Sequence, residues 1–246
     1  MKYLNYILTA IIAIAIASCQ FTEEITINKD GSGEFKFSMD MSQMISMSKN
    51  MGTNNDSIEK EYEVIDSTFF MKNLLEEHKD SLKNLSKEEL RSLEAIKDLK
   101  MHMLIDEKKG KMMIDFIQDF DDISEIENMQ NKINKAQELQ KGKMKEGEDV
   151  QDHDITYSYK RKSFKRIVKM RTLSEEDQAK ADEQIESFGS FLSGSEYKLI
   201  YHFPKKIKEI SYKGAQFSED RKTVTIVVDM DSLTKNPRLL DFDISF

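Results

Sequence analysis

Side chains that could act as catalytic groups are few and scattered in this sequence. The four histidines are His78, His102, His153 and His202, and no HExxH or GxSxG motif is present. Asp152 and Asp154 flank His153, but no second pair of ligands stands at zinc spacing, so a solvated acidic segment explains these residues better. The sequence predicts no catalytic residues, no metal site and no cofactor. A hydrolytic enzyme of unrecognised type is the alternative if distant residues converge in the fold.

A run of methionines could bind a soft metal ion, because thioether sulfur favours Cu(I). The run consists of Met39, Met41, Met44, Met47 and Met51. However, the last three fall on one helical face, and methionine is an ordinary filler of hydrophobic cores. We therefore expect the run to pack in the core, with Cu(I) binding as the less favoured alternative.

The segment from Lys160 to Arg171 carries seven cations and no acid in an otherwise acidic chain. Such asymmetry can mark contact with anionic headgroups or phosphorylated glycans. The candidate contacts are Lys162, Lys165, Arg166 and Lys169. The tip and solvated face of a β-hairpin would look the same, and the sequence favours that simpler interpretation.

Cys19 follows a segment that is typical of a secretory signal. Lys2 provides the positive start, and residues 6–17 provide the apolar stretch. The four residues Ile16-Ala17-Ser18-Cys19 resemble the lipobox of bacterial lipoproteins, with Ile16 where that family usually has Leu. In the family, the cysteine thiol receives a diacylglycerol, the chain is cut before the cysteine, and the new amino group is acylated. The resemblance implies a signal peptide at 1–18 and a mature chain that begins at a lipidated Cys19.

A membrane-spanning helix explains the same segment less well. Such a helix needs roughly 20 apolar residues, whereas this run is shorter and continues into Gln20 without a positive flank. We therefore expect the membrane to be a partner through the lipid alone. Glu23 and Glu24 weakly resemble acidic tags that direct some lipoproteins to the cell surface. We nevertheless expect the periplasmic face of the outer membrane.

Composition is consistent with an exported folded body. The net charge of −8 argues against nucleic acid as a partner. Because Cys19 is the single cysteine, no disulfide can form within the chain. Residues 19–246 are enough for one domain with an ordinary core.

The first elements of the body are predicted to be a hairpin followed by helices. Apolar residues alternate on both sides of Asp30-Gly31-Ser32-Gly33, which predicts two antiparallel strands. The turn resembles half of an EF-hand loop, but Met39 stands where the closing carboxylate belongs. A helical stripe begins at Phe70, and a capping box formed by Ser86 and Glu89 predicts a second helix from Lys87.

Further strands and helices alternate along the rest of the chain. Strands are predicted at 100–106, 111–118, 155–159, 164–170, 197–203, 224–230 and 240–246. Ile126, Met129, Ile133 and Ala136 predict one helix, and the acids before them suit its first turn. Another helix is predicted at 175–188, with Ser174 as N-cap and Gly189 just after its end. A flexible linker is expected near 140–153.

The segment 196–233 resembles the C-terminal part of the LppM-type bacterial lipoprotein domain. The matching features are Phe203-Pro204, Ile207, the stretch 215–218, Asp220 and Thr223-Val224. This resemblance implies an envelope lipoprotein with an α+β body and lipid as a ligand. It supplies no catalytic residues.

The predicted fold class is α+β, with a curved antiparallel sheet built from hairpins and amphipathic helices packed on one side. The predicted function is that of a lipid-anchored envelope protein. We expect a non-catalytic binding or structural role toward a lipid, another apolar ligand or an envelope protein.

Overall fold

The computed structural model describes residues 20–43, 45, 64–77, 87–94, 96–129, 132–133, 152–192 and 194–246. Cys19 and the predicted signal peptide lie outside this part of the chain. So do Met44, Met47 and Met51, and all of the predicted linker before Asp152.

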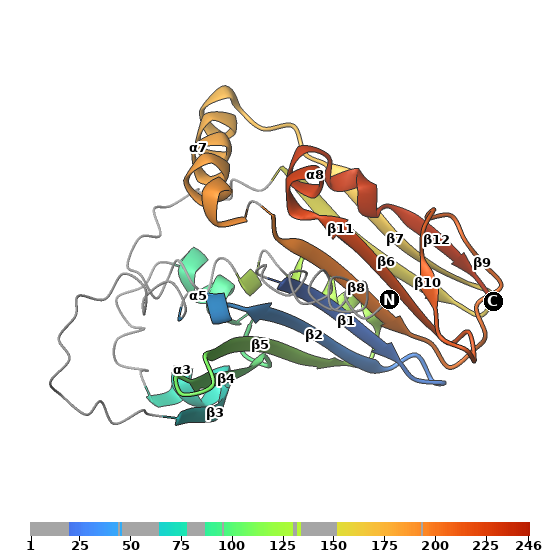
Figure 1. Cartoon of the computed structure of the whole chain (residues 1–246), viewed down its shortest axis with the longest axis horizontal. Helices are drawn as coiled ribbons and strands as arrows, with labels where there is room; N and C mark the ends of the chain where they lie inside the picture. The colour runs from blue at the N-terminus through green and yellow to red at the C-terminus, as the bar shows by residue number, and fades with distance from the viewer. Residues whose placement is uncertain are drawn as a thin grey trace, which may run out of the picture.

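Two β-sheets dominate the described structure (Figure 1). The larger sheet has eight strands in the order β10 (Gln216–Phe217), β11 (Thr223–Asp229), β8 (Glu196–His202), β1 (Gln20–Ile27), β2 (Gly33–Asp40), β5 (Lys111–Phe120), β4 (Lys100–Asp106) and β3 (Val64–Phe70). The smaller sheet has four strands in the order β6 (His153–Lys160), β7 (Ser163–Met170), β12 (Phe242–Ser245) and β9 (Glu209–Ile210).

Helices are few, and most of them are short. They are α3 (Met71–Glu77), α5 (Lys87–Glu94), the 3₁₀ turn η1 (Ile123–Ile126), α7 (Glu175–Leu192), α8 (Met230–Lys235) and the 3₁₀ turn η2 (Pro237–Leu240). None of the helices in the described ranges is long and apolar enough to cross a membrane.

The β1–β2 hairpin is confirmed, and its turn explains its register. Gly31 adopts a φ of 99°, which a residue without Cβ reaches without strain. Asp30 Oδ1 accepts hydrogen bonds from the backbone N–H of Ser32 (3.2 Å) and from its hydroxyl (2.8 Å). These local contacts hold Ile27 opposite Gly33, and every later pair of the hairpin follows from that register.

The sheet itself differs from the prediction. We expected one curved antiparallel sheet, but the strands form two sheets, and the larger one is mixed and not curled. β1 runs parallel to β8, with Gln20 opposite Glu196 and Thr26 opposite His202. The other pairings are antiparallel. Local patterns predicted the hairpins, but the parallel pair joins strands that are far apart in the sequence.

Most predicted strands are present, and some element boundaries differ. β3 was not predicted, and it extends through Phe70, so the helix that was predicted from Phe70 begins at Met71. The predicted N-cap of α7 is confirmed, because Ser174 Oγ accepts a hydrogen bond from Asp177 N at 3.1 Å. The predicted end at Gly189 is wrong, since α7 continues to Leu192.

The hydrophobic core lies between the two sheets. Phe164 of β7 packs edge-on against Tyr201 of β8 and against Phe203, with ring centroids 5.4 and 5.2 Å apart. Phe242 of β12 lies 5.9 Å from the Tyr201 ring. Burial of such large aromatic side chains is the main contribution to holding the sheets face to face.

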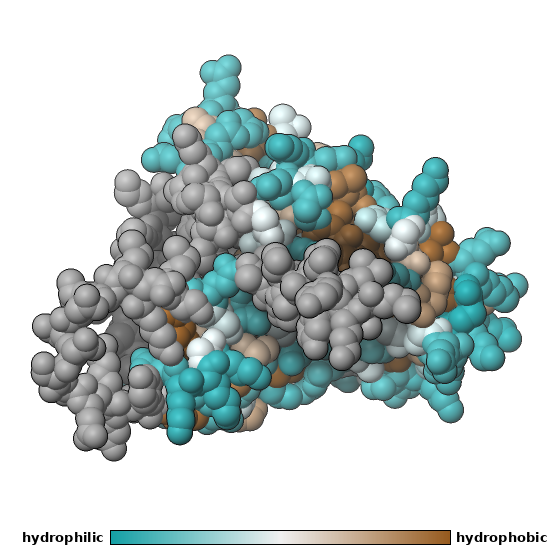
Figure 2. All heavy atoms as spheres, viewed as in Figure 1, coloured by the Kyte–Doolittle hydropathy of each residue, from teal (hydrophilic) through white to brown (hydrophobic). Residues whose placement is uncertain are grey.

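The opposite face of the larger sheet carries mainly polar side chains, but a hydrophobic area is visible beside β11 and α8 (Figure 2). Val227 of β11 is 40% exposed. It lies on this outer face because it stands opposite Lys198, whose neighbours Tyr197 and Leu199 point into the core.

Candidate functional site

A buried carboxylate lies in the core between the two sheets. Glu23 of β1 is 1% exposed, and it stands beside Phe37 of β2 and Leu199 of β8 in the sheet register. Its neighbours on the same face of β1 are Phe21 and Ile25. An acid in such surroundings needs several hydrogen-bond or charge partners to offset the loss of water.

Three tyrosine hydroxyls supply most of those partners. Tyr157 of β6 donates to Glu23 Oε1 at 2.9 Å, and Tyr201 of β8 donates to the same oxygen. Tyr197 of β8 donates to Glu23 Oε2 at 2.8 Å. The donors come from both sheets, so the carboxylate connects them across the core.

Arg166 of β7 completes this buried cluster. Its Nη2 lies 3.5 Å from Glu23 Oε2, and its Nη1 donates to the backbone oxygen of Leu240 at 2.9 Å. Its Nε is buried without a hydrogen-bond partner in the described structure. Arg166 is therefore less completely satisfied than Glu23, which has three hydroxyl donors.

Burial and charge shift the ionisation of the cluster. Burial raises the pKa of Tyr157, Tyr197 and Tyr201 well above the usual tyrosine value, and the nearby charge of Glu23 raises each further. Burial by itself lowers the pKa of Arg166, but the charge of Glu23 together with the interactions with the three tyrosines more than offsets this, so that pKa lies above its ordinary value. The tyrosines therefore act as neutral hydrogen-bond donors and the arginine as a cation.

The cluster has the geometry of a structural connection. Glu23 and Arg166 are at most 2% exposed, and the three tyrosine side chains are also buried. A general acid or base has to reach the substrate that it protonates or deprotonates. In the described structure these groups are instead engaged with one another and with the backbone between the sheets.

The burial of Arg166 removes it from the four candidate headgroup contacts. Along β7, Phe164, Arg166 and Val168 point inward and alternate with Lys165 and Lys169. Lys165 Nζ lies 2.8 Å from Asp243 Oδ1 on the neighbouring strand β12. Of the four predicted contacts, Lys162 and Lys169 are therefore the exposed cations with no ion pair to any described acid.

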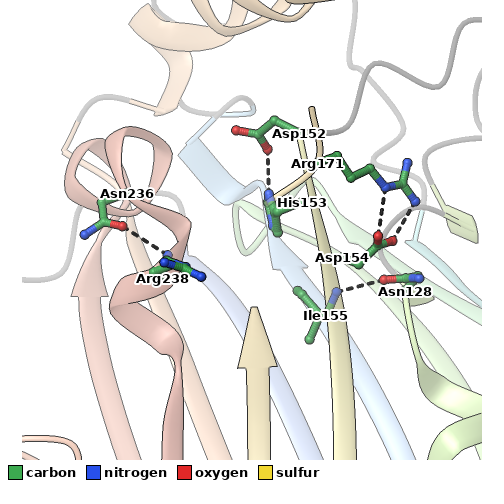
Figure 3. Close-up of polar contacts among 8 residues, drawn as sticks. All are labelled: Asn128, Asp152, His153, Asp154, Ile155, Arg171, Asn236 and Arg238. Carbon is green, nitrogen blue, oxygen red and sulfur yellow. Dashed lines mark hydrogen bonds and ion pairs between the residues drawn. The ribbon is translucent and has the colours of Figure 1, made fainter. Parts of the chain in front are cut away.

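The acidic group at the start of β6 is also occupied by local partners (Figure 3). Asp154 accepts hydrogen bonds from Arg171 Nε at 2.9 Å and from its Nη2 at 2.6 Å. This pair lowers the pKa of Asp154. His153 Nδ1 lies 2.6 Å from Asp152 Oδ1. Within the part of the chain that the structure describes, no three His, Cys, Asp or Glu side chains converge as a metal site.

Asn128 anchors the neighbouring segment to the same strand, at the right of Figure 3. Its side-chain oxygen accepts from Ile155 N at 2.8 Å, and its backbone N–H donates to Ile155 O at 3.2 Å. Its φ of 54° is one that asparagine adopts more readily than most residues. At the left of Figure 3, Asn236 accepts a hydrogen bond from Arg238 N at the start of η2.

His102 forms a second charged network on the outer face of the larger sheet. Its Nε2 lies 2.9 Å from Asp66 Oδ1 of β3, and its Nδ1 lies 3.1 Å from Asp115 Oδ2 of β5. Hydrogen bonds to Asp66 and Asp115 raise the pKa of His102. Because both ring nitrogens face carboxylates, neither is available as a general base. This arrangement gives no support to a Ser–His–Asp type of catalysis.

Asp115 lies between two basic side chains, Lys36 and His102. Burial by itself raises its pKa, but hydrogen bonds with Ser38 and His102 and the charge of Lys36 more than offset this, so the pKa lies below the usual value. Lys36 Nζ lies 3.5 Å from Asp115 Oδ2. The network thus connects β2, β5, β4 and β3 across the sheet.

The remaining predicted positions have simpler surroundings. Met39 and Met101 are partly buried and pack against the core. For Met39, which belongs to the methionine run, this agrees with the prediction that the run packs in the core. Glu24 pairs with His202 Nε2 at 2.9 Å. Cys19 lies outside the described residues, so its lipidation stays a prediction.

The main residues missed by sequence reasoning are Glu23 and the three tyrosines. Strand alternation was the available signal, because Glu23 shares its face with Ile25, and Arg166 shares its face with Phe164. Two opposite charges on inward positions imply an ion pair. The sequence does not show that these two strands face each other.

Comparison with known proteins adds no relative. No family model, no curated protein and no solved structure matches this chain.

Proposed function

We propose that this chain is a lipid-anchored protein of the bacterial cell envelope with a non-catalytic binding or structural role. The observation that carries the proposal is the position of β1. This strand begins at Gln20, directly after Cys19 in the sequence, and Gln20 is already paired with Asp40 on one side and with Glu196 on the other.

This position means that a lipid on Cys19 would be joined to the central sheet without a spacer. A flexible linker of ten or more residues would let the body move away from the bilayer. Here the body is instead held at the membrane by the end of a central strand. This close attachment suits a protein that acts on or at the membrane surface.

A non-catalytic role agrees with the use of the charged groups. Glu23 and Arg166 connect the sheets, His102 connects strands, and Asp154 is held by Arg171. The ligand class that we propose is a lipid or another apolar molecule. Exposed apolar side chains on β3 and β11 support it, namely Val64, Phe70 and Val227.

We also propose that the protein faces the periplasm from the outer membrane. Glu23 is buried and Glu24 pairs with His202, so in the folded body neither is a free acidic side chain next to the anchor. This supports the periplasmic location over export to the cell surface.

The anchor is tested with the full-length precursor expressed in a bacterial host. Wild-type protein should be found in membranes and carry diacylglycerol and acyl mass at Cys19, whereas Cys19→Ser should be soluble and lack that mass. Ser18→Ala is the matched control, because it keeps a small residue before the cysteine. Membrane association of Cys19→Ser equal to that of wild type would show that the cysteine is not the tether.

The ligand is tested separately on a soluble variant. Residues 20–246, purified without the signal and incubated with envelope lipid extract, should retain lipid that native mass spectrometry detects and that organic extraction identifies. A mass equal to that of the bare chain after this incubation would contradict the binding role and leave the structural one.

A further inference from the structure

Three loops meet at the end of the molecule where the β6–β7 turn lies. Lys205 Nζ from the segment after β8 donates to Arg161 O in that turn at 2.8 Å. Phe203 N donates to Lys222 O before β11 at 2.9 Å. Hydrogen bonds thus connect the three loops, and residues far apart in the sequence form one surface.

This surface carries a concentration of cations, which we call the basic tip. It consists of Lys160, Arg161, Lys162, Lys205, Lys206 and Lys222. All except Lys205 are exposed, and none has an ion pair with an acid in the described ranges. The end of the molecule that bears β9 in Figure 1 is covered by hydrophilic residues in Figure 2.

The neighbouring acids offset only part of the charge of the tip. Glu219 and Asp220 are the acids in the loop before β11, and the charge of Asp220 interacts with that of Lys222. Two acids beside six cations leave the surface positive. Arg221 is not part of the tip, since it stacks 4.5 Å from the Phe217 ring centroid and donates to backbone oxygens.

One cation of the tip, Lys205, lies over two aromatic rings. Its Nζ lies 5.6 Å from the ring centroid of Tyr159 and 5.9 Å from that of Phe246. The two rings pack edge to face at 6.0 Å. A lysine beside aromatic rings is suited to the zone between lipid and water.

The basic tip lies at the opposite end of the strands from Gln20. β1 and β8 run parallel from the Gln20–Glu196 pair to the Thr26–His202 pair, and β8 then continues into Phe203 and Lys205. A strand of this length spans roughly 25 Å, at about 3.3 Å per residue. Gln20 and the tip are therefore separated by about one strand length.

We infer that the basic tip binds anionic phospholipid headgroups of the membrane that holds the Cys19 lipid. The strands would then lie along the bilayer surface, with the lipid at one end and the tip at the other. This orientation of the strands along the bilayer rests on the proposed anchoring at Cys19, but headgroup binding by the tip does not. Tethering makes weak headgroup contacts effective, because it keeps the tip at high local concentration near the bilayer.

Headgroup binding is tested with residues 20–246, which lack the anchor, so that failure here and failure of Cys19 acylation are separate results. The protein is mixed with vesicles of neutral phosphatidylcholine, or of phosphatidylcholine with phosphatidylglycerol, and sedimented. We expect binding to the anionic vesicles only, and weaker binding at high salt because exposed charges are screened.

The tip variant changes Lys160, Arg161, Lys162 and Lys206 to Gln. We expect its partition into anionic vesicles to fall by at least about 50-fold, since each cation near an anionic surface contributes roughly fivefold. The control variant changes Lys87, Lys108, Lys111 and Lys235 to Gln, which alters the net charge equally at exposed sites elsewhere. It should bind within about threefold of wild type, because a cation contributes to binding only where it approaches the anionic surface.

Several results would overturn the inference. Equal loss of binding in the tip and control variants would show a general charge effect, and unchanged binding in the tip variant would exclude the tip. Tight binding of soluble inorganic polyphosphate without vesicle binding would assign the surface to a phosphate-bearing soluble polymer instead.

The orientation of the protein on the bilayer is tested with the lipidated protein inserted in anionic vesicles. If the strands lie along the bilayer, the tip contacts the same membrane and the vesicles stay dispersed in light scattering. Vesicle clustering that is lost in the tip variant would show that the tip reaches a second membrane. That result would overturn the inferred orientation of the strands along the bilayer.

Discussion

At the scale of single residues, Glu23 and Arg166 have unequal surroundings although they form one ion pair. Glu23 retains three tyrosine donors if Arg166 is removed. Arg166 retains the Leu240 carbonyl alone if Glu23 is removed, and its Nε already lacks a partner. The arginine therefore depends more on the glutamate than the reverse.

This asymmetry predicts unequal costs of mutation. Removing one partner of a buried ion pair costs about 3–5 kcal/mol. Glu23→Leu should lie at or above the upper end of that range, because it leaves a buried cation, and Arg166→Met should lie at the lower end. The double variant should be less destabilised than the sum of the two, as measured by urea unfolding. Additivity within about 0.5 kcal/mol would contradict the coupling.

His102 predicts a pH dependence on the other side of the larger sheet. Its pKa is raised in the folded state, so its contribution to stability is fully present below the unfolded value of about 6.5 and is lost as pH rises through the folded value. The free energy of unfolding should therefore decrease as pH increases above about 6.5.

In His102→Gln, this part of the pH dependence should be absent, because glutamine does not titrate. His202→Gln serves as the matched control, since it removes another histidine from the same sheet face. Urea unfolding at a series of pH values measures both. If the free energy of unfolding of His102→Gln varied with pH as it does in the wild type, His102 would not be the source of the pH dependence.

At the scale of elements, the β1–β2 hairpin depends on one glycine at its closing pair. Gly33 pairs with Ile27 on one side and with Phe120 on the other. A Cβ at this position would lie 2.0 Å from the backbone oxygen of Thr26 and 2.5 Å from Phe120 Cζ. The absence of a side chain thus lets three strands and an aromatic ring approach closely.

Gly33→Ala should destabilise the protein by about 3 kcal/mol, the upper end of the range for overpacking, because a backbone atom cannot move aside as a side chain can. Lys29→Ala in the same turn should change stability by less than about 0.5 kcal/mol, since Lys29 is exposed. Thermal unfolding compares the two. A midpoint for Gly33→Ala equal to that of wild type would mean that the strand pair is looser than described.

At the scale of the whole molecule, the buried cluster connects ionisation to the separation of the sheets. Tyr197 and Tyr201 belong to the larger sheet and Tyr157 to the smaller one, and all three donate to Glu23. A tyrosinate beside that carboxylate would bring two negative charges together in the core. These hydroxyls should therefore ionise only when the sheets come apart.

This predicts cooperative unfolding in alkali. The pKa values of the three tyrosines are raised in the folded state, so their stabilising effect is complete below the unfolded value of about 10 and decreases above it. Ultraviolet absorbance should show these tyrosines ionising together with the loss of circular dichroism above about pH 10. Residues 20–246 in urea provide the reference, in which all six tyrosines of this segment titrate independently, since Tyr3 and Tyr6 belong to the predicted signal peptide. Independent titration of all six in the folded protein would contradict this coupling.

The sequence by itself determined the local elements. Alternation of apolar residues predicted the hairpins β1–β2, β4–β5 and β6–β7, because adjacent strands need only a short turn and a matching register. The N-cap of α7 at Ser174 and the start of α5 at Lys87 were likewise predicted, since capping involves only neighbouring residues. The same alternation also places Glu23 and Arg166 on inward faces.

The tertiary structure alone decided how these elements combine. The parallel pairing of β1 with β8 joins residues more than 170 positions apart, as in the contact of Tyr197 with Glu23. It also decided that Arg166 meets an acid in the core rather than a headgroup at the surface, and that the exposed cations of three separate loops meet at the basic tip. The physical reason is that turns and caps depend on neighbouring residues, whereas burial and charge pairing depend on which distant segments share the core.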